Sequence, residues 1–390
     1  MQTPRPRLIA AALAAFAFAG SASLAAEPVQ VGMITTLSTG AGYLGEDIRN
    51  GFALALDMAD AQERIALSVE DDGRKPEQGL QIAERMIERD GIKILTGIVF
   101  SNVAMAVVPK VVRQDVLYLS PNAGPSALAG KGCHPFYFNV AWQNDNLHEA
   151  MGQHTSDEGV GKMYLLAPNY PAGQDALTGF KRFYQGEVVG EVYTQLGQTD
   201  YAAEIAEIRN AEPDGVFFFL PGGMGIQFVK QYAQAGLNET IPLYGSAFSF
   251  DDTLLDAVGE AAIGARNTSQ WSPDLDNPAN QAFVEAYTAK YERAPTLYAS
   301  QGFDTANLLL AALDATGDSV DDLQALRVAL AEAEFDSVRG AFAFGPNQHP
   351  IQDIYVREAY AAEDGNITNR TLGKVFEQHQ DAYAGACDMW

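Results

Sequence analysis

The sequence lacks the residue patterns that mark common catalytic sites. No G-x-S-x-G, H-E-x-x-H or P-loop pattern occurs in it, and we expect no G-x-G-x-x-G after a strand. Its five histidines are scattered, and the two nearest to each other, His148 and His154, are six residues apart and would not share a helical face. We therefore expect no catalytic residue, no metal ion and no cofactor.

Cysteine is nearly absent, since Cys133 and Cys387 are the only two. Their spacing is not the C-x-x-C of a redox or metal site. In an exported protein two cysteines favour one disulfide bond, here between Cys133 and Cys387, which would tie the C-terminus to an earlier loop. The alternative is a pair of buried free thiols.

Long apolar runs are also missing. The apolar run near the N-terminus, residues 8–20, is shorter than the ~20 residues that span a membrane. Two arginines precede this run and a Ser-Ala-Ser-Leu-Ala-Ala segment follows it, which predicts a secretory signal peptide over residues 1–26. No cysteine follows the expected cleavage site after Ala25 or Ala26. We therefore predict a soluble exported protein that is not lipid-anchored.

Basic residues are few, because 25 Lys and Arg face 50 Asp and Glu and give a formal net charge of -25. The predicted signal peptide contains two arginines and no acidic residue, so its removal makes the chain more negative still. Such a chain is a poor partner for nucleic acid or anionic membrane surfaces. Its 390 residues and 47% hydrophobic content are enough for two domains.

Buried strands and amphipathic helices alternate along the chain, which predicts an α/β fold. One block of strands and helices precedes residue 140, and a second block of the same kind follows it. The elements after both blocks are too few for a third domain, so we expect them to complete the first two, with the chain crossing between the domains more than once. The predicted strands cover residues 29–34, 65–71, 92–97, 116–120, 162–168, 186–193, 214–223, 241–248, 338–344 and 351–360, and two late helices cover 278–291 and 300–316.

The stretch from residue 94 to residue 128 predicts a binding site. It contains two buried strands, and a helix that starts near Ser101 lies between them. Loops that follow neighbouring parallel strands lie at one edge of the sheet, where open α/β sheets bind ligands. The free amides of a helix N-terminus at that edge suit an anion. We therefore predict that a small-molecule carboxylate binds beside Ser101, the alternative role of this serine being a plain helix N-cap.

Five segments carry a family resemblance through their order and spacing. They are VGMITTLSTGAGYLGEDIRNGFALAL, TGIVFSN, YLSPNAGPSAL, FLPGGMGIQFVKQYAQAGL and YASQGFDTANLLLAAL. With them the chain resembles the periplasmic substrate-binding proteins of ABC importers, in the Leu/Ile/Val-binding-protein-like group. The resemblance implies the type I periplasmic binding protein fold, an α/β fold of two Rossmann-like, doubly wound lobes joined by three crossovers. It also implies a ligand trapped between the lobes and delivery to an ABC permease in the inner membrane.

The resemblance also implies an assignment of residues to lobes. Residues 27–142 and 272–345 would form the first lobe, and residues 143–271 and 346–390 the second, with the C-terminal tail returning toward the first. The protein would be a periplasmic monomer that binds no nucleic acid. Carried over position by position, the implied ligand-binding residues are Tyr43, Phe100, Ser101, Asn122, Ala123, Gly124, Tyr170, Pro221, Gly222, Ala247, Tyr298 and Phe303.

Ala247 is a departure from the family pattern that bears on the ligand. Branched-chain amino-acid binders of this group carry an acidic residue at the corresponding place to hold the ligand's ammonium group. A buried ammonium without an anionic partner is costly, so a binder of free amino acids needs another acid, for which Asp304, Asp251 and Asp175 are the candidates. The hydroxyl that amino-acid binders often carry is also missing at Gly124.

Aromatic residues replace these polar groups near the predicted strand ends. We expect about a third of them to touch a ligand and the rest to belong to the core. Segments such as NVAWQNDN also resemble those of proteins that bind benzoates and hydroxycinnamates. We therefore predict an aromatic or similarly apolar carboxylate as the ligand, the alternatives being a branched-chain or related amino acid and a role as a ligand-sensing receptor component. The aromatic residues concerned are Phe100, Phe219, Phe248, Phe250, Trp271, Tyr298 and Phe303.

Overall fold

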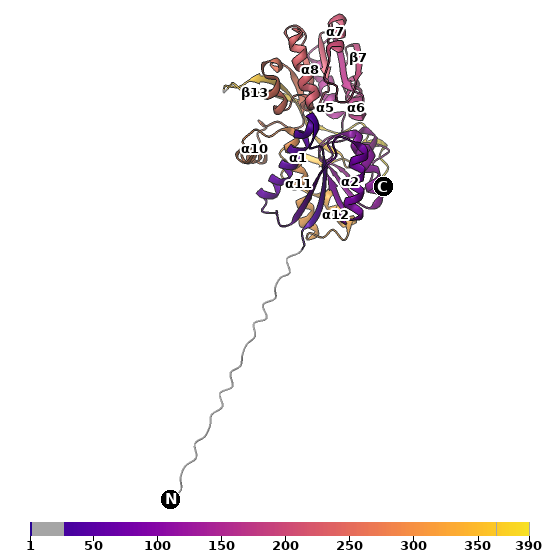
Figure 1. The fold of residues 1–390 in the computed structure, drawn as a ribbon, viewed down its shortest axis with the longest axis vertical. Coiled ribbons are helices and arrows are strands. Elements are labelled where there is room, and N and C mark those ends of the chain that lie inside the picture. The colour runs from indigo at the N-terminus through magenta and orange to yellow at the C-terminus, as the bar shows by residue number, and fades with distance from the viewer. Residues whose placement is uncertain (2–26, 364, 390) are drawn as a thin grey trace.

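The computed structural model describes residues 1, 27–363 and 365–389. Residues 2–26, which hold the predicted signal peptide, lie outside the described residues. The described chain forms two lobes, each built on its own β-sheet. The N-terminal elements lie in the lower lobe of Figure 1, and residues 162–234 lie in the upper one. Among the described residues, no helix combines the length and the apolar character needed to cross a membrane.

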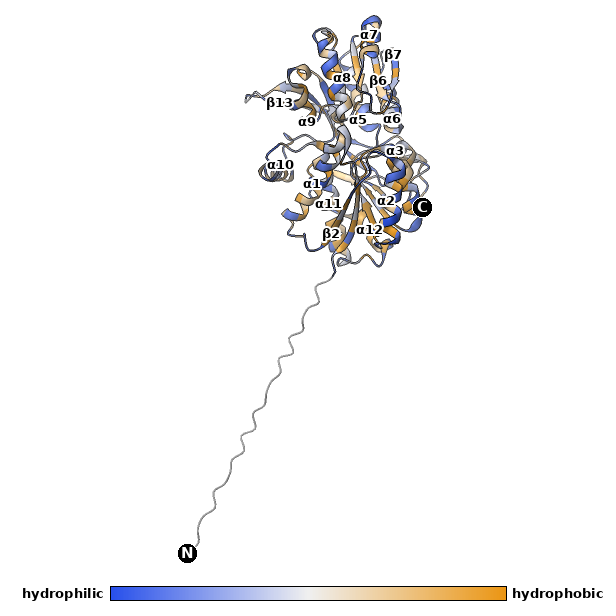
Figure 2. Ribbon diagram, in the orientation of Figure 1, coloured by the Kyte–Doolittle hydropathy of each residue, from blue (hydrophilic) through white to orange (hydrophobic). Residues whose placement is uncertain are grey.

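The first lobe contains a five-stranded parallel sheet in the order β2-β1-β3-β4-β5. Strands β3 and β4 are buried throughout, and β1 is buried except at Gln30, because helices cover both faces of the sheet. Figure 2 shows the apolar colouring of these strands in the interior of the lower lobe. The strands are β1 (Val29–Thr35), β2 (Ile65–Asp71), β3 (Ile94–Thr96), β4 (Leu117–Ser120) and β5 (Tyr137–Asn139), and the connecting helices are α1 (Gly42–Met58), α2 (Pro76–Glu88), α3 (Ser101–Val111) and α4 (Ser126–Ala129).

The second lobe contains an eight-stranded mixed sheet in the order β11-β12-β10-β9-β8-β6-β7, with β13 paired to β12. Strands β7, β6, β8, β9 and β10 are parallel, and β11, β12 and β13 add antiparallel pairs. The strands are β6 (Lys162–Pro168), β7 (Glu187–Thr194), β8 (Gly215–Phe218), β9 (Leu243–Ser246), β10 (Arg266–Ser269), β11 (Phe342–Phe344), β12 (Pro350–Ala361) and β13 (Ile367–His379). The helices are α5 (Asn146–Asp157), α6 (Pro171–Phe183), α7 (Ala202–Ala211), α8 (Gly223–Gln234) and α9 (Asp252–Val258).

Three late helices, α10 (Pro278–Tyr291), α11 (Leu297–Thr316) and α12 (Leu323–Glu332), return to the first lobe. Helix α11 packs along α1 at very short range through two glycines. A Cβ at Gly51 would lie 1.9 Å from the Ala299 carbonyl oxygen, and a Cβ at Gly302 would lie 2.0 Å from the Ile48 carbonyl oxygen. Only glycine permits this approach, so the two glycines fix the α1–α11 pair that carries residues to the cleft.

The chain passes between the lobes three times, after β5, after β10 and before β11. Arg339 ties two of these crossovers together from within the interior. Its guanidinium donates to the carbonyl oxygens of Val140 (2.7 Å) and Ala141 (3.2 Å) and to Gln352 Oε1 (2.9 Å), and it pairs with Asp304 at 2.8 Å. The predicted α/β fold of two doubly wound lobes with a three-crossover hinge is therefore confirmed.

Some local predictions differ from the structure. Helix α3 continues through Pro109 to Val111, although we would expect this proline to kink or restart a helix. Strand β11 pairs with β12 of the second sheet, so a lobe boundary at residue 345 separates two hydrogen-bonded strands.

Cys133 and Cys387 form the predicted disulfide bond, with their Cα atoms 5.7 Å apart. It anchors the C-terminal tail to the loop that follows α4. Within this tail the Tyr383 hydroxyl donates to Asp145 in the first crossover at 2.8 Å. The tail therefore returns to the hinge.

Candidate functional site

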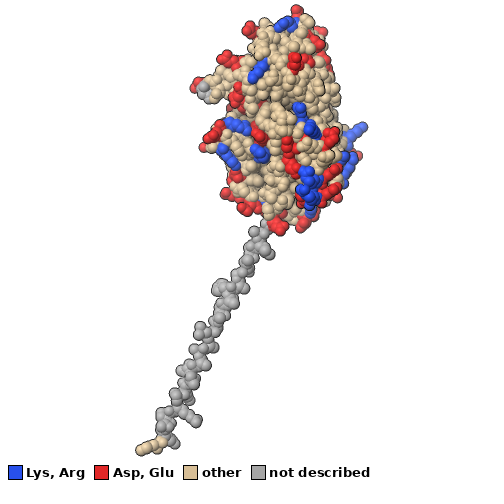
Figure 3. All heavy atoms as spheres, viewed as in Figure 1, with Lys and Arg blue, Asp and Glu red and all other residues tan. Residues whose placement is uncertain are grey.

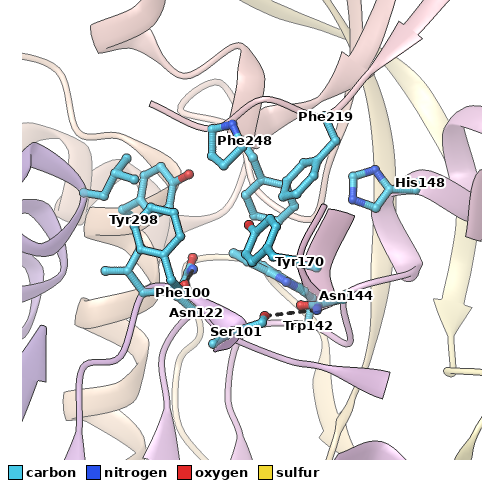
Figure 4. A pocket seen from close by; sticks show the side chains of 15 residues that line it. Phe100, Ser101, Asn122, Trp142, Asn144, His148, Tyr170, Phe219, Phe248 and Tyr298 are labelled. Atoms are coloured by element: carbon cyan, nitrogen blue, oxygen red, sulfur yellow. Dashed lines mark hydrogen bonds between the residues drawn. The ribbon is translucent and has the colours of Figure 1, made fainter. Parts of the chain in front are cut away.

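A cavity lies between the lobes, at the carboxyl ends of the parallel strands (Figure 4). Loops after β3 and β4 and two helices of the first lobe supply one wall, and loops after β6, β8 and β9 supply the other. The first crossover and the start of α5 close one side. The lining residues are Leu44, Val99, Phe100, Ser101, Asn122, Ala123, Trp142, Asn144, His148, Tyr170, Ala172, Phe219, Pro221, Phe248 and Tyr298.

Six of the 15 lining residues are aromatic, and they come from both lobes. Tyr170 and Phe219 are nearly parallel, with centroids 6.3 Å apart and an interplanar angle of 10°. Phe100 lies 6.3 Å from Tyr170, and Trp142 meets Phe248 edge-on at 4.2 Å. All five of these rings are buried, and their flat apolar faces suit a planar apolar group.

Ser101 brings polar donors to the floor of the cavity. It is the first residue of α3 and not its N-cap, which is Phe100 and makes no side-chain capping bond. The Ser101 Oγ accepts a hydrogen bond from Asn144 Nδ2 at 3.1 Å, so its own hydroxyl hydrogen is available to a ligand. The backbone amides of Ser101 and Asn102 have no partner among the described residues. These neutral donors and the helix dipole together suit a carboxylate.

The hydroxyls of Tyr170 and Tyr298 add two further donors. Burial raises the pKa of both phenols well above their usual value, so both stay protonated. Neither hydroxyl is hydrogen-bonded to another described residue, although both side chains line the cavity. They are therefore free to donate to a bound anion.

Ionised side chains are absent from the described residues that line the cavity. The three candidate replacements for the missing amine-binding acid all have protein partners, and none of them lines the cavity. Asp304 is paired with Arg339, and Asp251 accepts from the Tyr43 hydroxyl at 2.9 Å. Asp175 accepts from the Ser126 hydroxyl at 2.6 Å and from Asn144 at 2.9 Å. None of the three is positioned at the cavity to hold an ammonium group.

The structure brings seven of the implied ligand-binding residues together in this cavity and places five outside its lining. The seven are Phe100, Ser101, Asn122, Ala123, Tyr170, Pro221 and Tyr298. Of the five, Tyr43 reaches across the cleft to Asp251, and Phe303 packs against Phe283 with ring centroids 4.7 Å apart. Their side chains are committed to protein contacts.

Gly124, Gly222 and Ala247 also lie outside the cavity lining, each for a different structural reason. A Cβ at Gly124 would lie 2.1 Å from the Trp142 carbonyl oxygen, so this glycine serves packing and does not open the cleft. Gly222 precedes α8 with a φ of 66° that favours glycine. Ala247 is fully buried, and its neighbour Phe248 lines the cavity instead.

The remaining aromatic candidates divide between cavity and core. Phe219 and Phe248 line the cavity, whereas Phe250 packs against Phe218 at 5.2 Å and Trp271 against Phe283 at 6.1 Å.

Three lining residues of the first crossover and α5 were not predicted from the sequence. They are Trp142, Asn144 and His148. They come together because the chain leaves β5 and enters the second lobe directly beside the cavity. A signal for them existed, since Trp142 and Asn144 belong to the NVAWQNDN segment.

The segment after β1 contains a G-x-G-x-x-G spacing at Gly40, Gly42 and Gly45, so the expectation that no such spacing follows a strand is wrong. In dinucleotide-binding folds this spacing receives a pyrophosphate, and an acid after the next strand binds the ribose. Here a Cβ at Gly45 would lie 2.1 Å from the Thr36 carbonyl oxygen, so a close turn accounts for this glycine. Asp72 after β2 accepts from the Thr36 hydroxyl at 2.7 Å. These contacts account for the pattern without a nucleotide.

Across residues 1, 27–363 and 365–389, no group of three or more His, Cys, Asp and Glu side chains is arranged to hold a metal ion.

The comparison against protein families agrees with this two-lobed fold and its cavity. Residues 28–365 match the model described as periplasmic binding protein. The chain belongs to the periplasmic binding protein family. A curated relative, the Leu/Ile/Val-binding protein homolog 6 of Brucella melitensis, is 28% identical over 384 residues, which cover 95% of this chain and 97% of the relative.

Solved structures of binding proteins share the fold closely. A solute-binding protein of an ABC transporter from R. palustris, in complex with benzoate, is 31% identical with a TM-score of 0.87, and the match covers 93% of this chain and all of that one. Another from Rhodopseudomonas palustris BisB5, in complex with 3,4-dihydroxybenzoic acid, is 27% identical with a TM-score of 0.86 over 91% of this chain and 99% of that one. The leucine-binding protein LivK of Thermotoga maritima, 20% identical with a TM-score of 0.78 over 88% and 97%, shares the fold.

Membership of this family establishes the general role of the chain. It is a solute-binding component of an ABC transporter, and it works with a membrane permease. Proteins of this family act in the periplasm as carriers of small molecules, and they are transport proteins rather than enzymes.

Proposed function

We propose that this binding protein captures an aromatic carboxylate, of the benzoate or hydroxycinnamate class, and delivers it to its permease. One observation carries the proposal: the cavity is walled by aromatic rings, offers neutral donors at Ser101, and contains no ionised side chain among its described lining residues. We place the aromatic ring of the ligand between Tyr170 and the neighbouring rings. Its carboxylate then accepts hydrogen bonds from the α3 amides and from the nearby hydroxyl groups.

The ligands of the similar solved structures support this class. The two Rhodopseudomonas proteins described above hold benzoate and 3,4-dihydroxybenzoic acid, and they are 31% and 27% identical to this chain. The negative charge of this chain does not oppose an anionic ligand strongly, because exposed charges more than about 8 Å away are screened at physiological salt. Figure 3 shows Asp and Glu side chains interspersed with Lys and Arg on the outer surface.

A branched-chain amino acid is the second candidate, because the curated relatives carry Leu/Ile/Val-binding names. The cavity argues against it. None of the three acids lines the cavity. Asp251 and Asp304 are paired away from it, and Asp175 is already paired with Ser126 and Asn144, so a bound ammonium group would meet no unpaired anion.

A thermal-shift panel on ligand-stripped protein tests the proposal. A ligand that binds only the folded state adds about 2.7 kcal/mol at 100 times its Kd, which raises the melting temperature by several degrees. We expect benzoate, 4-hydroxybenzoate or a cinnamate to raise it and leucine, valine and isoleucine to leave it unchanged. Stabilisation by an amino acid and by no aromatic acid would reject the aromatic class and favour the second candidate.

We also propose how the protein is processed on export, in what state it exists and how its chain divides into lobes. The signal peptide is cleaved after Ala25 or Ala26, and the mature protein is a soluble monomer that binds no nucleic acid. The lobes comprise residues 27–142 with 272–341 and residues 143–271 with 342–390, the boundary being moved from residue 345 because β11 pairs with β12. A second role in a ligand-sensing complex uses the same cleft. N-terminal sequencing and light scattering of the exported protein test the first two points.

A further inference from the structure

His148 lines the cavity, but its side chain forms no hydrogen bond with another described residue. It is the third residue of α5, its side chain is 1% exposed, and its Nδ1 is buried without a partner. Three rings surround it, those of Phe219 (5.1 Å), Phe217 (5.7 Å) and Phe248 (6.0 Å). An apolar side chain would pack in this place without an unmet hydrogen bond. A polar ring at this place needs a hydrogen-bond partner, and the described residues supply none.

The protonation state of His148 restricts the partner. Burial lowers the pKa of this imidazole to about 3, so the ring is neutral near pH 7. A neutral imidazole has one N–H donor and one acceptor nitrogen. A hydroxyl group both donates and accepts, so it can pair with the ring in either tautomer.

Asn122 provides a second unpaired polar atom in the same lining. Its Nδ2 donates to the Val99 carbonyl oxygen at 2.6 Å, which fixes the orientation of the amide, because the reverse orientation would set two oxygens against each other. The Oδ1 atom is then buried without a partner. An ionised carboxylate has no hydrogen to offer it, whereas a hydroxyl has.

The position of His148 sets which part of a ligand it meets. Figure 4 shows Ser101 and Asn144 at the bottom of the cavity and His148 well apart from Ser101, beyond Tyr170 and Phe219. A carboxylate at Ser101 therefore leaves His148 to the distal part of the ring.

We propose that His148 is a specificity-determining residue that pairs with a neutral hydroxyl on the ligand's ring, so that the preferred ligands are ring-hydroxylated aromatic carboxylates. This inference rests on the proposed function, because it assumes a carboxylate bound at Ser101. It adds a preference among aromatic acids. A site built around a polar partner rejects an analogue that lacks the matching group, because the partner is then left buried and unpaired.

Calorimetric titration of the ligand-stripped full-length protein tests the inference with benzoate, 3-hydroxybenzoate, 4-hydroxybenzoate and 3,4-dihydroxybenzoate. We expect at least one hydroxylated acid to bind ~10-fold or more tightly than benzoate. In His148→Phe this ratio should fall to about one, chiefly through weaker binding of the hydroxylated acid, and His148→Gln should retain part of it. His154→Phe is the matched control, since His154 lies on the same helix and outside the cavity lining, and it should keep the wild-type ratio.

The outcomes separate the two proposals. Equal binding of benzoate and every hydroxylated acid by the wild-type protein would overturn the role of His148 and leave the aromatic-acid function standing. A hydroxyl preference that survives in His148→Phe would do the same. If the wild-type protein binds leucine and no aromatic acid, both proposals fall. The wild-type ratio and the His148→Gln variant keep the test decisive if His148→Phe does not fold.

Discussion

The Tyr43 hydroxyl on α1 of the first lobe donates a 2.9 Å hydrogen bond to the Asp251 carboxylate at the N-cap of α9 in the second lobe. A second cross-lobe contact joins Ser126 to Asp175 through the Ser126 hydroxyl and amide. Both contacts exist only when the lobes lie close together. The cavity between them is therefore held shut by neutral donors on one lobe and carboxylates on the other.

Tyr43→Phe should weaken ligand binding without changing the cavity lining. The variant leaves a buried carboxylate short of one partner in the closed form, which costs about 1 to 3 kcal/mol, or roughly 5- to 150-fold in Kd. Calorimetry with the ligand that the panel identifies measures this change. Tyr164→Phe is the control, because that hydroxyl bonds Glu207 within the second lobe, and its affinity should match the wild type. Equal affinities for both variants would contradict a role in closure.

Asp251 should make stability fall as pH rises toward neutrality. Burial raises the pKa of this carboxyl to about 7, whereas a carboxyl in an unfolded chain titrates near about 4. Between those values the folded protein holds a proton that the unfolded chain has lost, so the free energy of unfolding decreases through this window. Asp251→Asn, which retains an acceptor for Tyr43, should lose less melting temperature between pH 5 and pH 7.5 than the wild type. The same pH slope in both proteins would contradict this titration.

Arg339→Met should destabilise the hinge strongly. It removes the partner of the buried Asp304 carboxylate and the donors to two carbonyl groups of the first crossover. Leaving a buried charge unpaired costs about 3 to 5 kcal/mol, which urea unfolding measures. Arg64→Met, which breaks the partly exposed pair with Asp318, should cost only about 0 to 1 kcal/mol. Similar losses in the two variants would show that the Arg339 cluster does not hold the crossovers.

Replacing both cysteines by serine should loosen the C-terminal tail but spare ligand binding. The bond between Cys133 and Cys387 closes a loop with a sequence separation of 254, and loss of such a bond typically costs about 2 to 5 kcal/mol. Neither cysteine lines the cavity. We expect a lower melting temperature, faster proteolysis after residue 380 and an unchanged Kd. A large change in Kd would mean that the tail, through Tyr383 and Asp145, controls the hinge.

Ser101→Ala should weaken carboxylate binding by about 1 to 3 kcal/mol, because it removes a donor to a charged group. Helix α3 should be no less stable, since the Ser101 hydroxyl makes no capping bond. Calorimetry for the ligand and a thermal melt of the free protein measure the two effects. A loss of stability with unchanged affinity would return the serine to a structural role.

Much of the fold could be predicted from the sequence because buried parallel strands leave a clear apolar pattern. Strand β6 covers the predicted residues 162–168, and α10 covers the predicted 278–291. Strand β11 illustrates the limit, because it pairs with β12 in the second sheet although the expected lobe boundary at residue 345 assigned it to the first lobe.

The site was predictable in place but not in detail. The edge after β3 and the donors at Ser101 follow from local pattern, since parallel strands and helix N-termini have fixed geometry. Gly124 shows what local pattern misses, because the Trp142 backbone that excludes a side chain there comes from another segment. His148 was missed for a related reason. Only the three-dimensional fold sets its ring among three phenylalanines and leaves its nitrogen unpaired.

A crystal structure of the protein with 4-hydroxybenzoate tests the central claim most directly, namely that neutral donors at α3 hold an aromatic carboxylate between the lobes. The account predicts a carboxylate oxygen about 2.6 to 3.1 Å from Ser101 Oγ, with the ring between the Tyr170 and Phe100 side chains. A carboxylate bound instead to a charged side chain such as Arg74, whose guanidinium carbon lies 5.7 Å from the centre of the Phe100 ring, or a ligand outside this cavity, would contradict it.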